Sequence, residues 1–182
     1  MSRAFTLIES VIVVALFIVV MLGVMQLYIV FGRVIAGQSA SISAVLGGSD
    51  IIDAARSAGL PARSVVAAHT FSSVSYSSGT TTAIFELPSI DSSGALIPNA
   101  SDYIGIYASS TEAYRVIDAA QDSARVSGKK LLTNSLDALS FTYDSASFPS
   151  VTNVTVDATT SALARGQVAS VHLRERIYLR NL

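Results

Sequence analysis

Hydrophobic residues divide the chain into an apolar N-terminal run and a longer part in which apolar and polar residues alternate. Residues 11–32 contain no charged side chain. A helix rises about 1.5 Å per residue, so this run is long enough to cross a hydrocarbon core about 30 Å thick. A secretory signal has a shorter apolar core, of about 7–15 residues, followed by a small-residue cleavage site. The run therefore predicts a membrane-spanning helix.

The helical pattern continues beyond the apolar run. Four large apolar residues recur at helical spacing: Ile35, Ile42, Val45 and Leu46. Residues 33–60 are therefore expected to form an amphipathic second half of the long helix, with this stripe packed on the head. Gly47 and Gly48 predict an interruption, and Pro61 predicts the end of the helix.

From residue 61 onward the periodicity is that of strands separated by turns rich in Ser, Gly and Asp. Strands are expected at residues 65–75, 80–87, 102–108, 113–118, 136–143, 151–157 and 168–179. Glu175 is the one residue that does not fit the alternation of the last strand. The predicted fold is α+β, in which the second half of a long N-terminal helix packs on an antiparallel β-sheet head formed by residues 61–182.

Composition limits the function classes. The 182 residues suffice for one head and one anchor. The net charge is -1 and the 12 basic residues are scattered, so nucleic acid is not expected as a partner. The chain has no cysteine, which excludes both a disulfide framework and a thiolate metal site.

Candidate catalytic and metal-binding residues are few. His69 and His172 each stand alone in a predicted strand, without a nucleophile, metalloprotease or phosphate-binding motif. Asp91, Asn99 and Asp102 carry oxygen ligands, but their spacing matches no calcium loop and turn chemistry accounts for them. We therefore expect no catalytic residues, no cofactor and no metal.

One carboxylate, Glu9, lies close to the start of the apolar run. Thr6 to Glu9 matches a capping box, and the helix macrodipole favours an acid at this end. Its apolar neighbours place Glu9 at or below the membrane surface, where a charge costs up to about 2.5–3.5 kcal/mol. A cap contributes only about 1 kcal/mol. A cationic partner for Glu9 is therefore expected, and a plain signal anchor with a capping box is the alternative.

Residues 4–9, Ala-Phe-Thr-Leu-Ile-Glu, followed at once by the span, resemble the processing site of type IV prepilins and type II secretion pseudopilins. In that family a short leader is cut off before a Phe, and the new N-terminal amine is methylated. The acid five residues into the mature chain then pairs with that amine on a neighbouring subunit. The resemblance implies a leader of residues 1–4, cleavage between Ala4 and Phe5, N-methylation of Phe5, and an ion pair between Glu9 and the Phe5 amine of another copy.

Two positions depart from the family pattern. Ala4 stands where Gly is usual before the cut, and Gln26 stands where major pilins often carry Pro. The second departure favours a minor subunit. The resemblance then implies a minor pilin or pseudopilin of a type IV pilus-like filament, with residues 5–32 as the transmembrane and assembly helix.

The same resemblance implies partners and a location. The partners are other pilin subunits, a prepilin peptidase and methyltransferase, an inner-membrane assembly platform, and membrane lipid before assembly. Arg3 precedes the span and Arg33 follows it, which mildly favours a cytoplasmic N-terminus. The head would then be extracytoplasmic, and later part of a cell-surface or periplasmic filament. The alternative is a monomeric signal-anchored envelope protein whose β-rich head binds a ligand.

Overall fold

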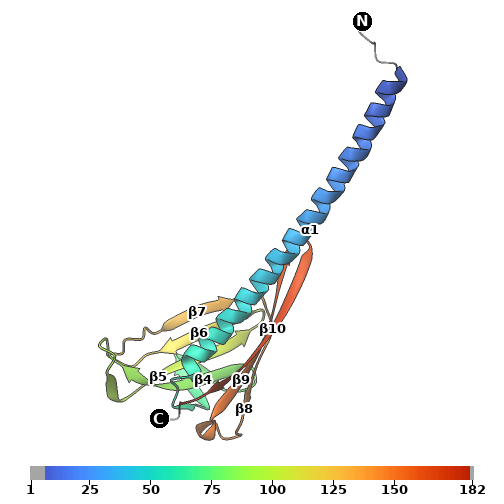
Figure 1. The fold of residues 1–182 in the computed structure, drawn as a ribbon. Helices are drawn as coiled ribbons and strands as arrows, with labels where there is room; N and C mark the ends of the chain where they lie inside the picture. The colour runs from blue at the N-terminus through green and yellow to red at the C-terminus, as the bar shows by residue number, and fades with distance from the viewer. Residues whose placement is uncertain (1–6, 181–182) are drawn as a thin grey trace.

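One long helix carries a β-rich head, in the α+β arrangement that the sequence predicts (Figure 1). The computed structural model describes residues 7–180. Helix α1 spans Leu7–Gly59. The strands that follow are β1 (Ser64–Val65), β2 (Ala68–Phe71), β3 (Val74–Ser77), β4 (Thr82–Ile90), β5 (Leu96–Ser109), β6 (Glu112–Asp118), β7 (Gly128–Thr133), β8 (Leu136–Tyr143), β9 (Asn153–Ala164) and β10 (Gln167–Tyr178). A short 3-10 helix, Phe148–Ser150, lies between β8 and β9.

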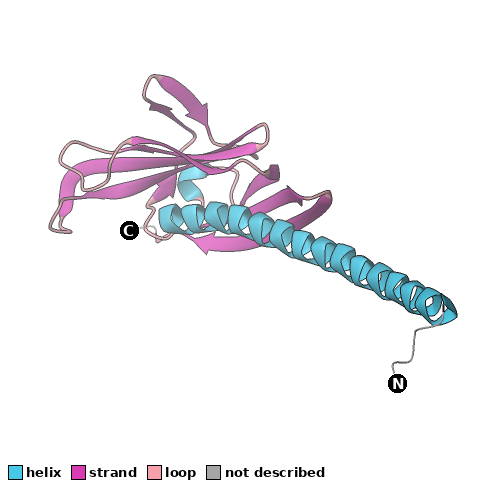
Figure 2. Cartoon of the chain, turned by 90° about the horizontal axis from the view of Figure 1, so that it is seen from above, coloured by secondary structure: helices cyan, strands magenta, loops and turns pink. Residues whose placement is uncertain are grey.

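The strands form two antiparallel sheets and a separate hairpin. The larger sheet has the order β1-β4-β5-β6-β7, and the smaller has the order β10-β9-β8. Strands β2 and β3 pair only with each other. The second half of α1 contacts strands of both sheets, and the first half of the helix extends well beyond them (Figure 2). This arrangement gives the helix one face toward the head and another toward solvent.

The main core lies between the second half of α1 and both sheets. Ile51 and Ala55 of the helix have no exposed surface there. They belong to one cluster with Phe85 and Ile106 of the larger sheet and Val156 of the smaller one. A second, smaller cluster lies under the β2–β3 hairpin. Burial of apolar surface stabilises a fold by about 25 cal/mol per Å². The main cluster therefore contributes more to the stability of the head than the smaller one.

Small residues, and not the predicted stripe of large ones, form the face of α1 that packs on the head. The buried helix positions include Ala36, Ala40, Ala44, Gly47, Gly48, Ile51, Ala55 and Ala58. Ile42 and Leu46 are both 60% exposed. A helix turns about 100° per residue, so these two residues, two positions either side of Ala44, lie roughly 160° away from it. The prediction that the Ile35, Ile42, Val45 and Leu46 stripe docks on the head is therefore wrong.

Gly47 and Gly48 do not interrupt the helix, contrary to the prediction, because they are contact points. A Cβ atom at Gly47 would lie 2.6 Å from Thr133 Oγ1, and one at Gly48 would lie 2.8 Å from Leu173 Cδ1. The hydroxyl of Thr160 comes close enough to donate a 2.6 Å hydrogen bond to the carbonyl oxygen of Ala44. The small side chains allow this approach, and the packing outweighs the low helix propensity of glycine.

Replacement of Gly47 by Ala is expected to destabilise the head. The new methyl group would overlap the buried Thr133 hydroxyl, at a cost of about 1–3 kcal/mol. That cost exceeds the gain of up to about 1 kcal/mol in helix propensity. Gly37→Ala is the matched control, because its Cβ position has no atom of the head within 4 Å, and it should raise stability. Thermal unfolding of the full chain in detergent micelles measures both, and a Gly47→Ala midpoint at or above the wild-type value would contradict the packing argument.

Glu175, the residue that does not fit the alternation of the last strand, has a partner on the helix. Its carboxylate accepts hydrogen bonds of 2.8 Å from Arg56 Nε and 2.6 Å from Arg56 Nη2. The Arg56 side chain is about half exposed, so the pair contributes more to alignment than to stability. It fixes β10 along the last turns of α1.

Candidate membrane and assembly interface

The first half of α1 has no contact with the head. From Leu7 to Ile35 every residue except Gly32 is exposed. Among the described residues α1 is the one helix long and apolar enough to cross a membrane. No part of its most apolar 18-residue stretch is buried. An exposed apolar surface of this size requires a partner, either lipid or other protein. The structure therefore agrees with a single-pass membrane protein.

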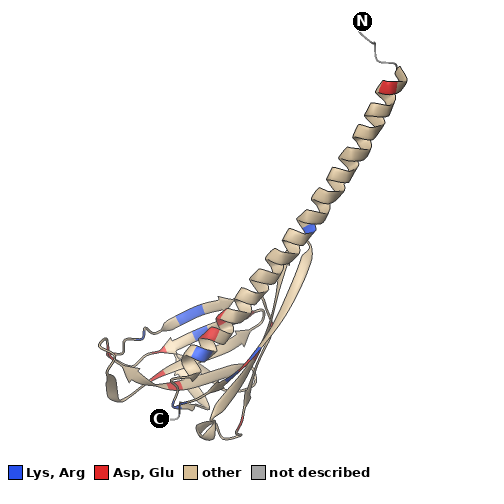
Figure 3. Cartoon of the chain, viewed as in Figure 1, with Lys and Arg blue, Asp and Glu red and all other residues tan. Residues whose placement is uncertain are grey.

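Charge is nearly absent along this part of the helix (Figure 3). Glu9 lies in the first turn, Arg33 is the next charged residue, and Asp50 follows only within the head. The uncharged run of residues 11–32 thus coincides with bare helix. A bilayer core and a bundle of similar helices both suit such a surface.

The predicted processing residues fall largely outside the described part of the chain. The described residues begin at Leu7. The predicted cleavage site, between Ala4 and Phe5, and the predicted N-methylation site, Phe5, both come before it. Thr6 of the capping box does so too. The Phe5 partner of the predicted ion pair is therefore outside the described residues. Glu9 itself is exposed, at the end of the helix where the macrodipole favours a carboxylate.

The apolar surface continues past Arg33 on the side of the helix that faces away from the head. Ile35, Ile42 and Leu46 are each at least 60% exposed. Their spacing of seven and four residues places them in one row. Large aliphatic side chains are thus exposed on the side of the helix opposite the buried row of Ala and Gly that packs on the head.

The two histidines of the head each face one carboxylate. His69 Nε2 lies 2.8 Å from Asp118 Oδ2, and its ring stacks on Tyr103 at a centroid distance of 3.8 Å. His172 Nε2 lies 3.3 Å from Asp157 Oδ1. Each histidine thus pairs with one acid of another strand.

A hollow of about 650 Å³ lies beside the β7–β8 connection of the head. Ser43, Thr133, Ser135 and Leu163 contribute to its lining, and Asp137 is its one acid. Polar hydroxyls around a single exposed acid provide no acid–base pair.

Asp102 forms a buried polar network that the sequence does not reveal. The carboxylate is fully buried and lies 2.5 Å from Arg125 Nη1. It also accepts hydrogen bonds from Ser89 Oγ at 2.5 Å, Ala120 N at 2.8 Å and Ser123 Oγ at 2.8 Å. Burial raises the pKa of Asp102, but these hydrogen bonds outweigh it and hold the pKa below its usual range. Asp102 thus fastens the segment between β6 and β7 to the larger sheet.

The three residues considered as oxygen ligands do not converge on one site. Asp91 caps its own turn and accepts hydrogen bonds from the amides of Ser93 and Ala95. Asn99 adopts a positive φ of 58° within β5, whereas the Asp102 oxygens are occupied by the network above. No group of three or more His, Asp or Glu side chains placed to hold a metal ion occurs in the described range. Searches of protein-family models, curated proteins and solved structures found no match to this chain.

Proposed function

We propose that this chain is a structural subunit, a minor pilin or pseudopilin, of a type IV pilus-like filament. In this proposal prepilin peptidase cuts between Ala4 and Phe5, the Phe5 amine is methylated, and α1 then enters a bundle of equivalent helices. The head would lie outside the cytoplasm, first at the membrane and then on the filament. Other pilin subunits and an inner-membrane platform are the partners that this role requires.

The observation that carries the proposal is the two-faced helix. Ala and Gly of α1 pack on the head, whereas Ile35, Ile42 and Leu46 face outward in line with the bare span. A monomeric anchor needs apolar surface only within the bilayer. Apolar side chains that continue beyond Arg33, opposite the head, suit a helix that packs against other helices over its whole length.

The position of Glu9 supports the same proposal. A carboxylate buried in a helix bundle is tolerated when a cation pairs with it, and a free amine at Phe5 of another copy would provide that cation. Such a pair would also set the axial register between subunits. The amine exists only after the bond between Ala4 and Phe5 is cut, so processing and assembly are linked in this scheme.

The N-terminal mass of the mature protein tests the proposal. We expect protein from cells with the peptidase to lack residues 1–4 and to carry a methyl group on Phe5. Protein from peptidase-deficient cells should keep all four residues. Ala4→Leu is the matched control, because a bulky residue before the cut should block processing in cells that contain the peptidase.

An intact N-terminus in both strains would contradict the proposal. The chain would then be better described as a signal-anchored envelope protein with a monomeric head. The head alone does not separate these functions, because both need only a stable extracytoplasmic domain.

A further inference from the structure

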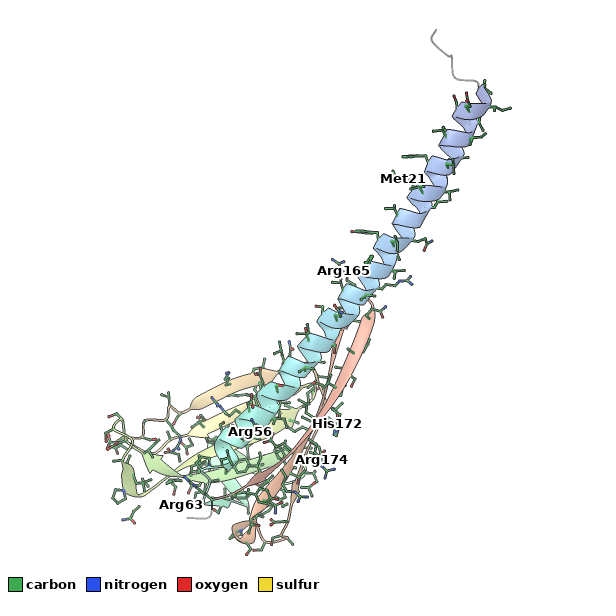
Figure 4. All side chains as sticks on the ribbon, in the orientation of Figure 1. Met21, Arg56, Arg63, Arg165, His172 and Arg174 are labelled. Atoms are coloured by element: carbon green, nitrogen blue, oxygen red, sulfur yellow. The ribbon has the colours of Figure 1, made fainter. Side chains whose placement is uncertain are left out.

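The β9–β10 hairpin reaches farther along α1 toward its N-terminus than the rest of the head does (Figure 1). Its turn is formed by Arg165 and Gly166, both at positive φ, 48° and 79°. Figure 4 places Arg165 beside the helix, well above the labelled His172 and Arg174. We call residues 163–168 the hairpin foot.

Contacts between β10 and α1 fix the level of the foot. A Cβ at Gly59 would meet Ile177, and one at Gly48 would meet Leu173, so strand and helix run in the same direction. Gln167 lies six residues before Leu173, about 20 Å at roughly 3.3 Å per strand residue. That distance corresponds to about 13 helix residues before Gly48. The foot is therefore level with about residue 35, which agrees with Ala36 being the first buried residue of the helix.

This level is where the membrane span ends. The uncharged run ends at Gly32, and Arg33 is the first charged residue after it. With residues 11–32 in a hydrocarbon core, Arg33 lies at the headgroups. A foot at the level of residue 35 lies within about one helical turn of the same surface.

The side chains of the foot differ from those at other hairpin ends. Leu163 and Val168 are cross-strand partners, and they are 70% and 72% exposed. At the β2–β3 end, Val74 pairs with the buried Phe71, and at the β4–β5 end Leu96 pairs with the half-buried Ile90. The foot thus exposes both members of an aliphatic pair.

The charged side chains that the helix and the hairpin carry near the foot are positive, and the acid contributed by another strand is Asp137 of β8, which lines a hollow with Leu163 and accepts a hydrogen bond from Ser161. Arg33 and Arg165 are exposed, and within residues 7–180 neither side chain makes a hydrogen bond or ion pair. No acid occurs at residues 10–49 of the helix or at residues 158–174 of the hairpin. Two unpaired arginines beside exposed aliphatic side chains match the interface of an anionic bilayer, where phosphates lie above acyl chains.

We propose that the foot is a second membrane contact, which rests on the outer end of the span. Leu163 and Val168 lie in the interface, and Arg165 and Arg33 bind phosphates of anionic phospholipids. This contact prevents free rotation of the head about the helix axis. The inference depends on the membrane span and is independent of the proposed filament.

A single tryptophan reports on the contact, because the chain contains none. Full-length Val168→Trp is reconstituted at low density in vesicles of phosphatidylcholine and phosphatidylglycerol. The tryptophan emission should be blue-shifted, and brominated phospholipid should lower the emission intensity about twofold or more. Leu96→Trp is the matched control, since it is 63% exposed at the end of a hairpin of the other sheet, and it should not be quenched. Leu163→Trp provides a second reporter if Val168→Trp folds poorly.

The proposed binding of Arg165 to lipid phosphates is tested by adding Arg165→Gln to the Val168→Trp variant. Quenching should fall in anionic vesicles and should then resemble that in pure phosphatidylcholine. Equal, unquenched emission from the Val168→Trp and Leu96→Trp variants would overturn the proposal. So would a blue shift that grows with protein density and is insensitive to brominated lipid, because that result would assign the foot to a contact between copies.

Discussion

Glu9→Ala is expected to leave the protein in the membrane and to remove it from filaments. The substitution deletes a charge at the edge of the span, so insertion becomes easier by up to about 2.5–3.5 kcal/mol. In a bundle, the proposed Phe5 amine of the next copy would lose its partner, and an unpaired buried charge costs about 3–5 kcal/mol. That cost corresponds to roughly two to four orders of magnitude in the incorporation equilibrium.

Fractionation measures both effects. The amount of protein in washed membranes should stay at the wild-type level, while the amount in sheared filaments should fall below detection. Gln26→Ala is the matched control, because it removes a polar side chain from the same exposed helix and has no proposed partner. If Glu9→Ala enters filaments as well as Gln26→Ala does, the carboxylate acts as a helix cap and the ion-pair proposal fails.

Sequence patterns predict the long elements of this fold because one strong signal dominates each. The uncharged run predicts a membrane-spanning helix, and alternation with turn residues predicts β4, β5, β6, β8, β9 and β10 in outline. The pattern predicts no strand at β7, because β7 is an edge strand with Lys129 and Lys130 exposed and little alternation. It predicts one strand in place of the β2–β3 hairpin, since the turn residues Ser72 and Ser73 carry no Gly or Pro signal although both adopt positive φ.

The packing face of α1 could not be predicted, because the helix carries two apolar rows, one of small residues and one of large ones. Periodicity identifies a row of large aliphatic residues and a row of small ones, but it does not say which partner covers which row. Close approach of two sheets selects the small row, as the contacts at Gly47 and Gly48 show. The Asp102–Arg125 pair could not be predicted from the sequence either, since Arg125 lies in a turn-rich segment 23 residues from its partner.

Asp102→Ala is expected to cause the largest loss of head stability among single polar substitutions in this network. It leaves Arg125, whose side chain is only 20% exposed, without its carboxylate, and three further donors lose their acceptor. Breaking a buried ion pair in this way costs about 3–5 kcal/mol. Asp102→Asn keeps the shape and one acceptor oxygen, so it should cost less than Asp102→Ala. Asp91→Ala, at an exposed turn, should have a smaller effect than either.

Hydrogen exchange locates the loss. In the full chain in detergent micelles, the amides of Ala120 and Ala124 donate to Asp102 and to the Ile90 carbonyl, respectively. Both should lose protection in Asp102→Ala, because the segment between β6 and β7 is released from the sheet. Unchanged protection at these two amides would show that the segment is held by its remaining contacts.

Acidification should reproduce in the wild-type protein part of the stability loss expected of Asp102→Ala. The pKa of Asp102 is lower in the folded state than its usual value, so the folded state gains stability from this carboxylate at pH above about 4. The gain decreases as pH falls through the folded-state pKa, where the carboxylate becomes protonated. Asp102→Asn cannot lose this contribution, so the difference in unfolding free energy between wild type and Asp102→Asn should shrink on acidification. A difference that stays constant from neutral pH to below about pH 3 would show that the Asp102 charge does not stabilise the fold.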